Sequence, residues 1–167
     1  MEVFGDRETF AVAFEPRRTS VPTLREAHAC YWIGGQQVGN WEAEFTYLGD
    51  LEADLAPIVR DNGRREAAEL WDLPPGQLMK TVLWRLIDDR QAGAPGAIDT
   101  PARFVILPGV SAFTGWQALA ITRGPEARIV FKHESWDAAQ DAVVEDIALE
   151  GALLSAWQWL TVLTAQS

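Results

Sequence analysis

The chain has 167 residues, of which 48% are hydrophobic, and it carries 24 acidic residues against 14 basic ones. This length fits a single domain over residues 1–167, and the hydrophobic content excludes wholesale disorder. A net charge of −10 argues against direct binding to nucleic acid or to an anionic membrane surface, since both need clustered Lys and Arg.

The N-terminal third predicts a β-hairpin. Phe10, Val12 and Phe14 alternate with alanines, which is the two-residue period of a strand. A second strand is predicted over 27–33, and residues 36–41 return as its partner. Gly34 and Gly35 link the two, because the tight turns of hairpins need positive φ.

Two helices are predicted next. The first has apolar residues at helical spacing, with Thr46 as its N-cap and Pro57 as a kink or stop: Leu48, Leu51, Leu55 and Ile58. The second covers 76–88, with Leu78, Val82 and Leu86 on its buried stripe. Residues 91–101 contain several Gly and Pro and are expected to form an exposed loop.

The C-terminal half adds strands and one more helix. We expect a strand over 104–107, a hairpin of 116–122 with 128–133 around Gly124, and a helix after Gly151. Periodicity leaves 136–149 open to helix or strand. The inward side of the last helix is predicted to carry Leu153, Leu154, Trp157 and Leu160. The order of elements predicts an α+β fold, with a mainly antiparallel sheet built from hairpins and with the two central helices and the C-terminal helix packed on one face.

Motifs for catalysis and for metal binding are missing from the sequence. There is no phosphate-binding loop and no paired His or Cys at zinc-ligand spacing. Ser111 lacks the closing glycine of a nucleophile elbow. His133, Glu134 and Asp137 are read as a strand end and a solvated turn. We therefore expect a protein that is not an enzyme and binds no cofactor and no metal.

The compartment is predicted from the cysteine content and the apolar segments. Cys30 is the sole cysteine, so no internal disulfide can form, and we interpret it as a packing residue. The N-terminus has no signal-peptide pattern. The apolar stretch at 153–165 is interrupted by polar residues and is shorter than the roughly 20 residues of a membrane span. These features predict a cytoplasmic protein.

Acidic and aromatic residues suggest a surface that binds a partner. No Lys or Arg occurs between Arg25 and Arg60 or after Lys132, although acids are frequent in both stretches. Such stretches would attract a basic partner, and exposed tryptophans would anchor it. Trp157 and Trp159 cannot both face inward from one helix, so one of them is a further candidate anchor. The candidate partner-binding residues are Glu42, Glu44, Asp50, Glu134, Trp136, Asp137, Asp141 and Glu145.

Several short motifs resemble a known family. They are FGDR at 4–7, YWIGGQQVG at 31–39, GWQAL at 115–119 and RIVFK at 128–132. This succession is similar to that of immunity proteins of bacterial polymorphic toxin systems, most closely the immunity protein 42 family. The resemblance implies a protein without enzymatic activity that binds a toxin domain made beside it and blocks the toxin's active site. It also implies structural roles for six positions: Asp6, Trp32, Gly34, Gly35, Gly115 and Trp116.

The charge agrees with this resemblance, because a nuclease toxin would present a basic cleft that carboxylates can fill. Three other interpretations stay open. The chain could be an acidic chaperone for a secreted effector that dimerises through its C-terminal helix, a hydrolase that uses carboxylates with His133, or a structural subunit of an assembly. The sequence does not decide between a monomer and a homodimer.

Overall fold

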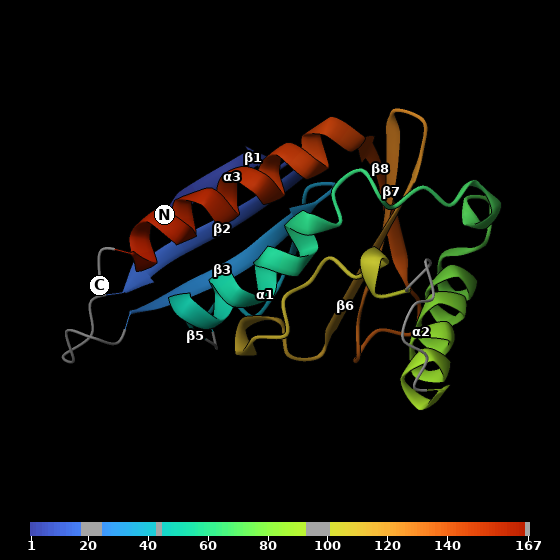
Figure 1. The fold of residues 1–167 in the computed structure, drawn as a ribbon, viewed down its shortest axis with the longest axis horizontal. Helices are drawn as coiled ribbons and strands as arrows, with labels where there is room; N and C mark the ends of the chain where they lie inside the picture. Colours follow the sequence, from blue (N-terminus) through green and yellow to red (C-terminus); the bar gives the residue numbers. More distant parts are fainter. Residues whose placement is uncertain (18–24, 43–44, 93–100, 166–167) are drawn as a thin grey trace.

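The computed structural model describes residues 1–17, 25–42, 45–92 and 101–165, with the backbone alone at 88–92. It shows an α+β fold with two antiparallel sheets and three α-helices, which confirms the predicted fold class (Figure 1). The two sheets and the helices that cover them lie at opposite ends of an elongated molecule.

The first sheet is built from the N-terminal strands. Its members are β1 (Glu2–Asp6), β2 (Phe10–Arg17), β3 (Glu26–Ile33), β4 (Gln36–Val38) and β5 (Thr46–Tyr47), with β5 paired to β3. The predicted hairpin is present, although β4 is shorter than expected. Phe10, Val12 and Phe14 alternate along β2 and are fully buried in the main core.

The second sheet consists of β6 (Trp116–Arg123), β7 (Glu126–His133) and β8 (Gln140–Glu145) in that order. The predicted hairpin of β6 and β7 is confirmed. The segment 136–149 divides at Glu145, where β8 ends and a helix begins. The predicted strand over 104–107 is wrong: a 3₁₀-helix, Pro101–Phe104, is followed by one isolated bridge from Val105 to Leu119.

Helices α1 (Leu48–Arg60) and α3 (Asp146–Thr164) cover the first sheet (Figure 1). All four apolar residues predicted for α1 are buried. Pro57 does not stop α1, which runs to Arg60. Thr46 is not its N-cap, because Thr46 pairs with β3 and the helix begins at Leu48 without a side-chain cap. In α3, Leu153 and Leu160 are buried as predicted, whereas Leu154 is exposed.

Helix α2 (Pro75–Ala92) is longer than predicted, and it lies on the far side of the second sheet from α1 and α3 (Figure 1). Alternate residues of β6 and β7 face two different cores. Ala118, Ala120 and Ile129 join the main core, whereas Leu119, Ile121 and Val130 pack with Leu78 and Val82 of α2. The expectation that all three helices share one face is therefore wrong. Of the predicted loop 91–101, residues 93–100 lie outside the described residues.

By length and composition alone, α3 is the one described helix that could cross a membrane. In this fold, five of its side chains pack into the main core: Leu149, Ala152, Leu153, Ala156 and Leu160. Trp159 of the same helix stacks on Phe14, with ring centroids 5.8 Å apart, so it is not the exposed anchor that the sequence suggested. Trp157 is also partly buried.

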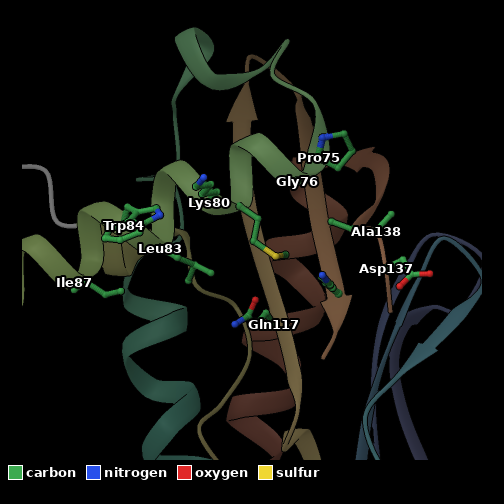
Figure 2. Close-up of a pocket in the computed structure, with 12 residues that line it drawn as sticks. Pro75, Gly76, Lys80, Leu83, Trp84, Ile87, Gln117, Asp137 and Ala138 are labelled. Atoms are coloured by element: carbon green, nitrogen blue, oxygen red, sulfur yellow. The ribbon is translucent and has the colours of Figure 1, made fainter. Parts of the chain in front are cut away.

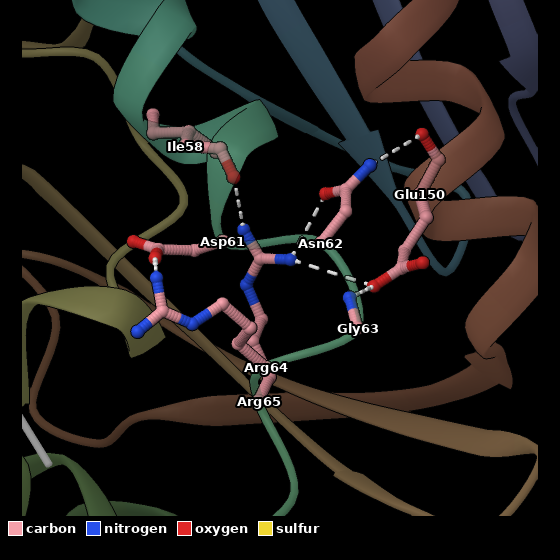
Figure 3. A network of polar contacts seen from close by, with 7 residues as sticks. All are labelled: Ile58, Asp61, Asn62, Gly63, Arg64, Arg65 and Glu150. Carbon is pink, nitrogen blue, oxygen red and sulfur yellow. Dashed lines mark hydrogen bonds and ion pairs between the residues drawn. The ribbon is translucent and has the colours of Figure 1, made fainter. Parts of the chain in front are cut away.

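A buried arginine joins the two halves of the molecule (Figure 3). The Arg65 side chain has no exposed surface. It donates to the Ile58 carbonyl at the end of α1 and, over 3.1 Å, to Asn62 Oδ1. A 3.8 Å ion pair links it to Glu150 of α3, while its carbonyl accepts a 2.8 Å hydrogen bond from Thr122 of β6. The side chain thus connects α1 with α3, and the backbone connects both with the second sheet.

We predict that Arg65→Ala lowers the free energy of unfolding by about 3 kcal/mol, because it removes the ion pair with Glu150 and leaves the Ile58 carbonyl and Asn62 Oδ1 without this donor. Urea denaturation measures this loss. The matched control is Arg64→Ala, since Arg64 is 63% exposed and pairs with Asp61 at the surface, a contact worth about 0.5 kcal/mol. Equal losses in the two variants would contradict the assigned role.

The thiol of Cys30 is predicted to be inert in the folded protein. Cys30 is 2% exposed on β3, and burial raises the pKa of its thiol to about 12, although the charge of Arg7 opposes the shift. Since the thiolate is the reactive form, iodoacetamide at pH 8 should leave the native protein unmodified and should label one thiol per chain in urea. Labelling of the native protein at the rate of a free thiol would show that this strand opens readily.

Candidate partner-binding surface

The residues with expected structural roles lie at turns and ring contacts. Gly34 and Gly35 form the β3–β4 turn with φ of 58° and 80°. Their N–H groups donate to Thr9 and Arg7 in the neighbouring β1–β2 turn. In that turn Asp6 Oδ1 accepts from the N–H of Glu8 over 3.0 Å. Next to it, the guanidinium of Arg7 lies 5.1 Å from the centre of the Trp32 ring. The two turns at this end of the first sheet are therefore held together by contacts of their own residues.

Gly115 and Trp116 begin β6 in a crowded place. A Cβ atom on Gly115, which has φ of 80°, would lie 3.0 Å from His133 Nε2. The Trp116 ring packs edge-on against His133 and Trp136, and its Nε1 donates to Asn40 Oδ1 over 3.2 Å. These contacts join the end of β7 to the segment after β4.

The acidic residues at β7 and β8 differ in whether they form an ion pair. Glu134, Asp137 and Glu145 are exposed, and none of them has an ion pair among the described residues. Asp141 instead accepts a 2.7 Å hydrogen bond from Nε of Arg128. The same guanidinium donates to the carbonyls of Trp71 and Leu73, so Asp141 helps to hold the segment before α2 against the sheet.

Trp136 is partly buried rather than projecting. Its ring centre lies 5.0 Å from that of Trp116 and 6.2 Å from that of Phe131. In this position most of the ring stabilises the β7–β8 connection.

The second acidic stretch borders a hollow at the start of α1. Asp50 is exposed in the first turn of α1, and Glu42 is exposed in the segment after β4, while Glu44 lies outside the described residues. Asp50, Asp54, Phe45 and Tyr47 line a hollow of about 440 Å³. Phe45 and Tyr47 are 43% and 45% exposed. Sequence reasoning missed both aromatics, although they flank the buried Thr46 as outward residues of a short strand would.

A larger apolar hollow lies between α2 and the second sheet and has a volume of about 590 Å³ (Figure 2). Trp84 and Ile87 of α2 border it and are 56% and 46% exposed. Lys80 and Lys132 also line it. Sequence reasoning did not find this hollow, because its two lysines and its tryptophan are brought together only by the packing of α2 on β6 and β7.

The groups considered for chemistry are engaged in local contacts. His133 Nδ1 lies 2.7 Å from Ser135 Oγ, and the hydroxyl of Ser111 donates to the Phe45 carbonyl over 2.7 Å. Among the described residues, no group of three or more His, Cys, Asp or Glu side chains is placed to hold a metal ion.

Comparisons with known proteins bear on the family and the fold of this chain. No curated protein matches the sequence. Among solved structures, the chain is similar to the crystal structure of CdiI from Burkholderia dolosa AUO158, with a TM-score of 0.73 and 16% sequence identity. That similarity covers 95% of this chain and 99% of the other one, and at such identity it shows a shared fold. The sequence model of the family described as immunity protein 42 matches residues 1–156, which confirms the resemblance and shows that this chain belongs to that family.

Proposed function

We propose that this protein is an immunity protein that binds a cognate bacterial toxin domain and inhibits it by covering its active site, without catalysis. The observation that carries this proposal is membership of the immunity protein 42 family over residues 1–156. The partner is therefore another protein, and we place the encounter in the cytoplasm, where a newly made toxin must be neutralised.

Charge gives the proposal its physical basis. With a net charge of −10, the protein attracts a basic partner over distances beyond direct contact. Glu134, Asp137 and Glu145 are exposed carboxylates that serve no ion pair among the described residues. A nuclease is the toxin class that suits such a surface best, because its cleft must bind phosphates and would accept carboxylates in their place.

Aromatic anchors complete this surface. Trp136 was the predicted anchor, but most of its ring packs against Trp116 and Phe131. Phe45 and Tyr47 are better suited, because they are exposed and border the hollow that contains Asp50. Aromatic residues at the centre of an interface contribute much of the binding energy.

The alternatives gain no specific support. A chaperone dimer through the C-terminal helix could not use Leu153 and Leu160, which are buried in the main core. It would depend on the exposed Ile147, Leu154 and Val162 of the same helix. In a hydrolase centred on His133 the ring would act as a base, but this ring packs against Trp116 and its Nδ1 accepts a 3.2 Å hydrogen bond from the N–H of Ser135 in the local turn.

Protection in cells tests the function directly. We define the upstream toxin domain as the C-terminal domain of the secreted protein encoded immediately before this chain. Expression of that domain alone should stop growth, and co-expression of this protein should restore growth and allow the two to be purified as a complex. Continued growth arrest with no complex would overturn the proposed function.

Association kinetics test the acidic surface. Replacing Glu134 and Glu145 by lysine should slow association with the upstream toxin domain about tenfold at low salt and weaken its salt dependence. Asp137 is left intact, because it lines the hollow that also contains Lys80 and Lys132. Asp141 is left intact, because it holds Arg128. The control carries the same change of charge at Glu2 and Glu8, which are exposed elsewhere. Equal slowing in both variants would show that net charge alone matters and that the contact lies elsewhere.

A further inference from the structure

The hollow beside α2 and the hollow beside α1 are joined by a third one. This middle hollow has a volume of about 330 Å³. It shares Leu83 and Gln117 with the hollow beside α2, and it shares Gly109, Val110 and Ser111 with the hollow beside α1. Because neighbouring hollows share lining residues, we treat the three as one surface and name it the α2–α1 groove.

The end of the groove beside α2 is apolar and basic (Figure 2). Lys80 and Lys132 are the only lysines of the chain, and both line this end. Neither has an ion pair among the described residues, and the one acid of the lining is Asp137. Trp84 and Ile87 supply exposed apolar surface beside them. On a protein with 24 acidic residues, this end is suited to a carboxylate next to an apolar side chain.

The end beside α1 has the opposite charge. Asp50 and Asp54 line it together with Phe45 and Tyr47, and no described residue of the lining is basic. Asp54 accepts a 2.9 Å hydrogen bond from the N–H of Gly109, so it is held in place, whereas Asp50 is exposed. The guanidinium of Arg17 already lies 5.3 Å from the centre of the Phe45 ring. The groups that favour a further guanidinium or ammonium group are therefore Asp50, Asp54 and the Tyr47 ring.

The middle of the groove carries no charged side chain among the described residues that line it. The sequence of environments along the groove is therefore basic and apolar, then neutral, then acidic and aromatic. A bound segment with complementary charges would fit in one direction only. In the reverse direction its charges would lie beside like charges of the groove, which is unfavourable.

We propose that the α2–α1 groove binds one extended segment of the toxin, with a carboxylate and an apolar side chain beside α2 and a cationic side chain beside α1. This inference rests on the proposed function and adds to it the site, the chemistry of the bound segment and its direction. Docking along this groove covers both sheets at once.

Charge reversal at each end tests the chemistry. Lys80→Glu with Lys132→Glu, and separately Asp50→Lys, should each weaken binding of the upstream toxin domain at least about tenfold. Trp84→Ala should have a similar effect. Two matched controls lie outside the groove and should leave binding unchanged: Arg85→Glu on α2 and Glu2→Lys on β1. The midpoint of urea unfolding is measured for every variant to show that each one is folded.

Cross-linking tests whether one segment spans the groove. Because Cys30 is buried, a cysteine introduced in place of Ala53 or Ala138 can carry a photoactivated cross-linker alone. Both alanines are exposed and line the two ends of the groove, and neither is a proposed binding residue. Both sites should label the same continuous stretch of the upstream toxin domain. Labelling of separate stretches, of a second copy of this chain or of nothing would overturn the inference. A wild-type protein that does not bind the toxin would instead refute the proposed function, so the two failures are distinguishable.

Discussion

The structure depends on how a fully buried guanidinium is satisfied. Burial lowers the pKa of Arg65, and the charge of Glu150 opposes that shift. The acceptors that offset its removal from water come from α1, Asn62 and α3 and contact its two terminal nitrogens, while Nε has no hydrogen-bond partner among the described residues. No described strand belongs to both sheets. The main core contains side chains of both sheets, and the contacts of Arg65 add a polar link between the two halves.

Aromatic residues are divided between the core and the surface according to their secondary structure. Phe10, Phe14 and Trp159 pack in the core of the first sheet, and Trp116 and Trp136 hold the end of the second. Trp84 remains exposed, because α2 covers the outer face of a narrow three-stranded sheet with only part of its surface. An acidic surface with a few exposed aromatics is suited to recognising another protein. This agrees with membership of a family of immunity proteins.

Local patterns in the sequence predicted local structure well. Three patterns correctly predicted a strand, a turn and a helix: the alternation at Phe10–Phe14, the Gly34–Gly35 pair and the spacing of the α1 leucines. Each pattern involves residues close together in the sequence. Thr46 failed as a cap because β3 supplies it with a strand partner far away in the sequence. The strand predicted at 104–107 failed because its apolar residues pack without continuous pairing. The lysine end of the groove could not be predicted, since Lys80 and Lys132 meet only through tertiary packing.

The central claim is that this protein acts by occupying its partner and performs no reaction. Titrating the upstream toxin domain with increasing amounts of this protein, and measuring the remaining toxin activity, tests that claim most directly. Inhibition by occupation predicts that activity falls linearly to zero at one immunity protein per toxin, and that dissociated toxin is chemically unchanged and active. Loss of activity at far lower ratios, with a toxin that stays inactive or modified after separation, would contradict it.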